Sequence, residues 1–260
     1  MVACSLAVLS AQELKGYDFV LDTYVRDGEV YYRALKLERA RLDAYVAQLA
    51  AASLDNQPPP ARAAFWMNAY NALVLKTVID HYPIQGRSSA YPQKSIRQIP
   101  GAFERLTHRV AGRSLTLDQI EQTMLPEFHD PRIFLAVGRG AEGGGRLRSE
   151  PFTAEKLDAQ LAEAATECAS RQNCLHVDRA NNKVSASSIF SWREKEFVPV
   201  YADRAPAPFA NRSPAERAIL GFVWPNLLTT EKEVLETNTF QVDYSQFDWR
   251  LNDLTGRGGR

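Results

Sequence analysis

The pattern of hydrophobic and polar positions predicts a chain built mainly of helices. One stripe with helical spacing consists of Leu42, Tyr45, Val46 and Leu49. It predicts a helix over residues 38–53, which the prolines of residues 56–63 end, because proline lacks the amide hydrogen that a helix interior needs. Residues 65–79 are apolar on nearly every side, which is typical of a helix at the centre of a core.

Two amides interrupt this apolar helix. Asn68 and Asn71 lie three residues apart and share one face. A buried amide without hydrogen-bond partners costs roughly 1–3 kcal/mol, so both residues need partners. Two interpretations stay open: the amides hold neighbouring loops onto the core, or they line a cleft and bind a ligand.

The remaining pattern predicts short strands between further helices. Thr116 is expected to cap a helix, with Gln119 completing a capping box, after a hairpin that turns at Gly112-Arg113. The further strands are expected at residues 132–137, at the start of residues 183–198 and within residues 240–252, the last as an edge strand with Gln241, Asp243 and Ser245 outward. The fold class is therefore α+β: a single helix-rich domain over residues 12–253, around a central buried helix, with a small and largely antiparallel sheet. Residues 254–260 are expected to form a flexible tail.

A glycine-rich segment follows the apolar run at residues 132–137. Gly138, Gly140 and Gly143 spell G-x-G-x-x-G, the spacing found in dinucleotide-binding loops. Such a loop opens a helix at once, because the pyrophosphate lies on the helix N-terminus. Here the next cap is Thr153, ten residues after Gly143. The segment is therefore not expected to bind a dinucleotide, and no cofactor is expected.

The same segment is rich in charge. Its ionisable residues are Arg139, Glu142, Arg146, Arg148 and Glu150. Guanidinium groups on a loop with accessible backbone amides could bind a small anion, through Arg139 with Arg146 as second donor. The alternative is a solvated loop with local Arg–Glu pairs, which contribute little.

Seven motifs stand in order along the chain: "FWMNAYNALVLKTVIDHYP", "SIRQIP", "LTLDQIEQTML", "DPRI", "LRSEPFTAEKLDAQLAEAA", "SSIFSWREKEF" and "FDWRLN". In this order and spacing, over residues 62–253, the chain resembles the domain-of-unknown-function family 547. The resemblance implies export, since bacterial relatives are commonly exported. It implies no activity, because the biochemistry of the family is unassigned.

The chain departs from its relatives at the glycine-rich segment. Aligned without gaps, the relatives' histidine falls on Phe134, their two cysteines on Arg139 and Gly144, and their proline on Gly145. Arginine stays protonated and is no nucleophile. We therefore expect a non-catalytic or small-ligand (anion) binding protein.

An enzyme is the alternative function. It would be a hydrolase or transferase in a polar cleft, with His81 paired with Glu142 or Glu150 for acid–base work and with Asn68 and Asn71 orienting the substrate. The sequence leaves this alternative open.

Charge and hydropathy narrow the classes of partner. The 260 residues contain 31 Lys plus Arg and 31 Asp plus Glu, so the formal net charge is zero. Nucleic-acid binding is not expected without a basic excess. Nor is a transmembrane segment, because no run approaches ~18 apolar residues. Residues 1–11 are apolar and small, like the remnant of a signal peptide, so we expect export to a periplasmic or extracellular location; a cytoplasmic location is the alternative.

The cysteines indicate the redox state of the compartment in which the chain is located. Cys168 and Cys174 lie six residues apart, and the third cysteine is Cys4. The pair suits one local disulfide in an oxidising compartment. A two-cysteine, one-histidine metal cluster with His176 is the alternative; with no second Cys or His pair at zinc-finger spacing, we expect no metal site.

Overall fold

The computed structural model describes residues 11–254, and their contacts divide into two compact units. The first unit contains residues 11–128, 137–157 and 249–254; the second contains residues 129–136 and 158–248. The prediction of one domain over residues 12–253 stays a prediction. The predicted signal remnant before Ala11, and the predicted tail after Leu254, lie outside the described residues.

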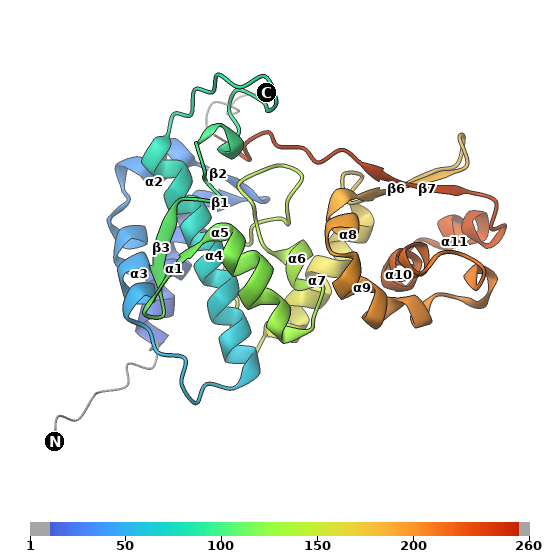
Figure 1. Cartoon of the computed structure of the whole chain (residues 1–260), viewed down its shortest axis with the longest axis horizontal. Coiled ribbons are helices and arrows are strands. Elements are labelled where there is room, and N and C mark those ends of the chain that lie inside the picture. The colour runs from blue at the N-terminus through green and yellow to red at the C-terminus, as the bar shows by residue number, and fades with distance from the viewer. Residues whose placement is uncertain (1–10, 255–260) are drawn as a thin grey trace. The chain divides into compact units, whose positions relative to one another are not determined.

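The first unit consists of helices and two small hairpins (Figure 1). Its α-helices are α1 (Ala11–Tyr24), α2 (Tyr32–Leu37), α3 (Ala40–Ala51), α4 (Pro59–His81) and α5 (Leu117–Gln119). Its other helices are η1 (Ile96–Gln98, 3-10), η2 (Ile120–Met124, π) and η3 (Leu125–Phe128, 3-10). The antiparallel hairpins pair β1 (Val25–Arg26) with β2 (Glu29–Val30) and β3 (Thr107–Val110) with β4 (Arg113–Thr116).

Helix α4 is the centre of the first unit, as the sequence predicts. Pro59 and Pro60 lie in its first turn, where proline costs nothing, because those amide hydrogens have no helical partner. Nearly every residue from Ala63 to Ile79 is buried. Figure 1 shows α4 running past α3, and it also contacts α2, η2 and η3. These neighbours surround the helix over most of its length, and Lys76 and Asp80 in its last turns reach the surface.

The β3–β4 hairpin corrects one detail. Its turn is at Ala111-Gly112, one residue earlier than predicted, and both residues have positive φ (47° and 72°). Two-residue hairpin turns favour this conformation because its twist matches the twist of the strands. The capping box of Thr116 and Gln119 is confirmed.

The second unit packs helices beside a three-stranded sheet. Its α-helices are α6 (Ile133–Ala136), α7 (Leu157–Ser170), α8 (Ser188–Trp192), α9 (Glu194–Tyr201), α10 (Pro214–Val223) and α11 (Thr229–Glu236). Its 3-10 helices are η4 (Ala202–Arg204), η5 (Ala207–Phe209) and η6 (Trp224–Asn226). Strand β6 (Lys183–Ser187) pairs antiparallel with β5 (Leu175–Asp178) and parallel with β7 (Gln241–Ser245), which is an edge strand as predicted.

The predicted strand at residues 132–137 is wrong. Residues Ile133–Ala136 form helix α6 and are all buried. A short apolar run fits a buried helix and a buried strand equally well, so its periodicity does not separate them. The α+β class is confirmed, with small sheets beside a helical majority. No helix in the described part of the chain is both long and apolar enough to cross a membrane.

Candidate functional site

The glycine-rich segment enters the core of the first unit. Residues 137–141 are all buried, and Arg139 is 2% exposed. Its guanidinium donates to Glu121 Oε1 at 2.6 Å, and the Tyr70 hydroxyl donates to Glu121 Oε2 at 2.7 Å. The sequence left two interpretations of this segment, an anion-binding loop and a solvated loop, and both require an accessible Arg139. Arg139 is buried, so both are wrong at this residue. The structure brings Arg139 to a carboxylate of its own chain.

Burial and charge act against each other in this cluster. Burial lowers the pKa of Arg139, but the charge of Glu121, the electrostatic effect of Tyr70 and the hydrogen bond to Glu121 together outweigh burial, so the pKa is raised. Burial, and then the negative charge of Glu121, raise the pKa of Tyr70 well above its usual value. Arg139 therefore keeps its charge and Tyr70 its proton. Neither group is suited to act as a base or a nucleophile at neutral pH.

The sequence carries a signal for Glu121 that our interpretation missed. Leu117, Ile120, Glu121 and Met124 follow the spacing i, i+3, i+4 and i+7 of one apolar face, and all four are buried. A carboxylate at such a position needs a buried cation or donor. Tyr70, on the uniformly apolar α4, supplies one donor, and Arg139 supplies the charge.

The two amides of α4 hold loop backbone onto the helix. Asn68 donates to the Phe152 carbonyl at 2.8 Å and accepts from the Phe152 amide at 2.9 Å. Asn71 accepts from the Gly138 amide at 2.9 Å. Gly140 lies against α4 with φ 64°, and a Cβ there would lie 3.1 Å from Val74 Cγ1. Asn71 and Gly140 therefore fix the backbone on both sides of Arg139.

Asn68 also lines a pocket at the amino-terminal end of α4. The cavity has a volume of about 200 Å³. Its lining residues are Tyr45, Ser53, Leu54, Gln57, Ala61, Ala64, Phe65, Asn68, Phe152, Thr153, Ala154 and Glu155. Three of these are aromatic, and the only ionisable acid or base among them is Glu155, apart from the Tyr45 phenol. The two interpretations of Asn68, loop support and cleft lining, are thus compatible.

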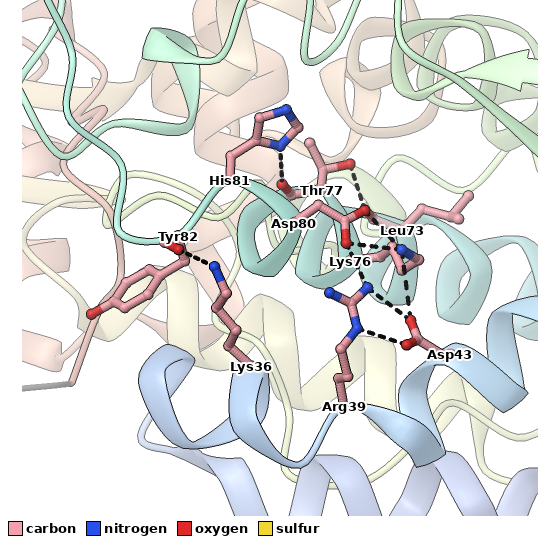
Figure 2. Close-up of polar contacts among 9 residues, drawn as sticks. All are labelled: Lys36, Arg39, Asp43, Leu73, Lys76, Thr77, Asp80, His81 and Tyr82. Atoms are coloured by element: carbon pink, nitrogen blue, oxygen red, sulfur yellow. Dashed lines mark hydrogen bonds and ion pairs between the residues drawn. The ribbon is translucent and has the colours of Figure 1, made fainter.

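His81 lies at the opposite end of α4. Figure 2 shows it at the last turn, where Nδ1 lies 2.8 Å from the Thr77 carbonyl. Thirteen residues separate it from Asn68, which corresponds to about 20 Å along a helix. The structure therefore does not bring His81 to Asn68, as the acid–base alternative requires.

The surroundings of His81 are an ion-pair network on the surface of the first unit. Arg39 binds Asp43 at 2.6 Å and Asp80 at 2.5 Å, and Lys76 binds Asp80 at 2.7 Å (Figure 2). The hydrogen bond from Arg39 lowers the pKa of Asp43. These side chains are 24–38% exposed, so the pairs contribute modestly to stability.

The other charged residues of the glycine-rich segment have separate partners. Arg146 pairs with Asp27, whose side chain is 92% exposed. Glu150 accepts from Arg148 at 2.7 Å and lies 3.8 Å from Lys156. The backbone amide of Glu142 donates to the Arg250 carbonyl at 2.9 Å. Arg139 and Arg146, predicted to bind one anion together, are thus paired with different carboxylates.

The second unit contains another buried arginine, and a disulfide. Arg193 is 1% exposed and lies over the Phe134 ring at 4.1 Å. Cys168 and Cys174 are disulfide-bonded, with 5.1 Å between their Cα atoms, so the disulfide alternative holds. Within residues 11–254, no cluster of three or more His, Cys, Asp and Glu is placed to hold a metal ion.

Comparison with known proteins gives one match. Neither the curated proteins nor the solved structures include a match to this chain. Residues 54–167 match the family model described as "Protein of unknown function, DUF547". The match spans α4, the Arg139–Glu121–Tyr70 cluster and most of the pocket lining. It agrees with the order of the sequence motifs, and it supports this chain as a member of the DUF547 family.

Proposed function

We propose that this chain is an exported, non-catalytic member of its family that binds a small molecule in the pocket beside Asn68. The pocket is the observation that carries the proposal. Ten of its twelve lining residues lie within the family-matched residues 54–167, the exceptions being Tyr45 and Ser53. A cavity built by the family domain itself is the default place for its ligand.

The lining indicates the chemistry of the ligand. An engineered apolar cavity of about 150 Å³ holds benzene, so about 200 Å³ accommodates a substituted aromatic ring. Tyr45, Phe65 and Phe152 supply aromatic surface, and Gln57 supplies an uncharged amide. The rim carries the Glu155 carboxylate, and no Lys, Arg or His lines the pocket. A neutral or cationic aromatic molecule therefore fits better than the anion expected from the sequence.

The buried arginine supports the absence of catalysis. Arg139 occupies the position where the resemblance places a cysteine, and its guanidinium is engaged by Glu121. A protonated guanidinium cannot attack a carbonyl or phosphoryl group. Export is supported by the Cys168–Cys174 disulfide, since such bonds persist in oxidising compartments.

Three probes of one shape test the binding proposal. Benzamide, benzamidine and benzoate share a ring and differ in charge, and calorimetry on the full chain compares them. At this pocket, measured as the binding that Ala61→Phe removes, we expect benzamide and benzamidine to bind more tightly than benzoate. Ala61→Phe fills the pocket and should weaken the binding of benzamide and of benzamidine at least about tenfold. Ala47→Phe, on the exposed face of α3, should leave the binding of both molecules unchanged. If neither benzamide nor benzamidine binds, or if both bind Ala61→Phe as tightly as wild type, the proposal that the pocket is a binding site is refuted.

Separate measurements test the other two parts. Phenyl acetate should be hydrolysed no faster than in buffer; turnover that disappears in His81→Ala or Glu142→Gln would support the acid–base enzyme instead. Intact mass of protein from its native host should show a shortened N-terminus and no free thiol at Cys168 or Cys174. A full-length chain with both thiols free would contradict export.

A further inference from the structure

The second unit contains a groove with the opposite chemistry to the pocket beside Asn68. Its volume is about 290 Å³. The lining residues, which come from α7, α9, α10, η4, η6 and the segment before α6, are Arg132, Ala162, Ala165, Thr166, Tyr201, Arg204, Gly221, Phe222, Trp224, Pro225 and Asn226. Two of them are arginines, three are aromatic, and none is a carboxylate.

Arg204 is the cation available to a ligand in this groove. It is exposed and lies over the Tyr201 ring at 4.9 Å. No ion pair joins it to any residue in the described part of the chain. A guanidinium stacked on a ring keeps its donor fork free at the edge, which suits a planar two-oxygen anion.

Arg132 has a different position in the same lining. It binds Asp130 with Nε at 3.0 Å and Nη2 at 2.7 Å, and it reaches Asp158 at 2.8 Å. Neither carboxylate lines the groove. Two carboxylates outside the groove therefore hold the Arg132 side chain in place and neutralise its charge. The Arg132 guanidinium forms part of the groove wall.

The uncharged polar residues add a further hydrogen-bond donor. The Thr166 hydroxyl lies 3.1 Å from both the Ala162 carbonyl and Asn226 Oδ1, and its one hydrogen can serve either acceptor. The Asn226 side chain therefore offers the donor Nδ2 beside the acceptor Oδ1. Beside these donors lie the Tyr201, Phe222 and Trp224 rings, which offer apolar surface.

We propose that this groove is a binding site for a small aromatic carboxylate. The carboxylate pairs with the Arg204 guanidinium, and the ring of the ligand packs against Trp224. Arg132 is already paired with Asp130 and Asp158, so Arg204 is the cation that the ligand meets. No carboxylate lines the groove, and aromatic rings lie beside Arg204, so an aromatic carboxylate is the chemistry that the groove recognises. The site goes beyond the proposed function: it lies on the second unit and prefers the opposite charge.

Benzoate and benzamide are the probes that test it, because they differ only in the anionic group. Calorimetry and the indole N–H signal of Trp224 are followed on the full chain. We expect benzoate to bind and to perturb Trp224, and benzamide to leave Trp224 unperturbed. Raising sodium chloride from about 0.05 to about 0.5 M should weaken benzoate binding, since salt screens exposed charges.

Three variants locate the binding. Arg204→Ala should weaken benzoate binding at least about tenfold. Arg204→Lys should recover part of this affinity, because lysine keeps the positive charge but lacks the paired N–H donors of the guanidinium. Arg179→Ala is the matched control: Arg179 is exposed, binds Thr230 at 2.7 Å and lies outside the groove. Circular dichroism checks that each variant is folded.

The outcomes separate this site from the pocket beside Asn68. Ala61→Phe should leave benzoate binding at Trp224 unchanged, whatever it does to benzamide. Benzoate binding that is unaffected by Arg204→Ala, or benzamide that perturbs Trp224 as strongly as benzoate, would overturn the proposal. Absence of benzoate binding by the folded wild-type chain would overturn it as well.

Discussion

Among residues 11–254, each unit buries one arginine, and the two arginines are held differently. In the first unit, Arg139 donates to Glu121 at 2.6 Å, and Tyr70 occupies the second oxygen of that carboxylate. In the second unit, Arg193 lies over the Phe134 ring at 4.1 Å and reaches Glu196 only at 3.5 Å. The Glu196 Oε2 atom is buried and has no hydrogen-bond partner. The first guanidinium is held by a carboxylate at hydrogen-bond distance, whereas the second stacks over an aromatic ring and makes a longer contact with a carboxylate.

The two arginines bear on the proposal that this chain is non-catalytic. By resemblance, relatives place a histidine at Phe134 and a cysteine at Arg139. Here the first position supports a guanidinium through its ring, and the second is itself a guanidinium. Both positions therefore take part in packing and charge pairing. This agrees with a chain whose loop serves stability rather than nucleophilic catalysis.

Removing the carboxylate beside Arg139 should have the largest effect. Glu121→Gln leaves a buried guanidinium without its counter-charge, and we expect the free energy of unfolding to fall by about 3–5 kcal/mol. Chemical denaturation measures the loss. Replacing both partners, as in Arg139→Met with Glu121→Leu, should recover much of it, because no charge then stays buried.

An exposed pair is the control for this variant. Glu127 pairs with Arg62 at 3.3 Å, and both side chains are exposed. Glu127→Gln should change stability by less than about 1 kcal/mol. If Glu121→Gln lowers the free energy of unfolding no more than Glu127→Gln does, Arg139 does not depend on a buried carboxylate. The difference drawn between Arg139 and Arg193 is then wrong.

Removing the other arginine should cost less. Arg193→Met keeps most of the side-chain volume and removes the charge over Phe134, so we expect a loss of about 2 kcal/mol, typical of a desolvated cation–π contact. Arg193→Lys retains a cation and should cost less than Arg193→Met. A loss equal to that of Glu121→Gln would show that charge pairing or hydrogen bonding, not the ring, dominates at Arg193.

The support of the Arg139 backbone can be tested separately. Asn71→Leu removes the acceptor of the buried Gly138 amide, which should destabilise the chain by about 1–2 kcal/mol. Gln48→Leu, on the exposed face of α3, serves as control and should have little effect. Wild-type stability in Asn71→Leu would mean that the Gly138 amide finds another partner.

Much of this framework could be predicted from the sequence. The uniformly apolar residues 65–79 predict a buried central helix, because no arrangement with a solvent-facing side suits them. The need of Asn68 and Asn71 for partners follows from the same burial. The capping box at Thr116 depends on four adjacent residues and was equally predictable. In these cases, the determining contacts are local or follow from burial alone.

The features that the sequence did not predict depend mainly on contacts between residues far apart in the chain. The identity of the partner of Arg139 depends on Glu121, 18 residues away, and on the course of the segment into the core. Charge and glycine content favoured an exposed loop, and only the Asn71–Gly138 bond shows why the backbone turns inward. Helix α6 was missed because four apolar residues carry too little periodicity.

The smallest expected effect concerns a half-buried group that lacks a contacting carboxylate. His108 on β3 lies 3.5 Å from Thr77 Oγ1, and its charged neighbours are Lys76 and Asp80. Burial, and then the positive charge of Lys76, lower the pKa of His108, and Asp80 only partly opposes them. Arg139 shows the reverse balance, since Glu121 and Tyr70 together outweigh burial there.

The sign of the pH effect follows from this shift. The unfolded chain takes up the His108 proton near the usual pKa of 6.5, and the folded chain does so only at lower pH. The contribution of His108 to stability is therefore complete above about pH 6.5 and is lost as the pH falls below that value. Denaturation between about pH 5 and 8 should show a steeper decline for wild type than for His108→Gln, while His176→Gln, an exposed residue on β5, should follow wild type. Parallel curves for wild type and His108→Gln would show that His108 is protonated equally in both states, and that burial in this unit does not suffice to exclude a charge.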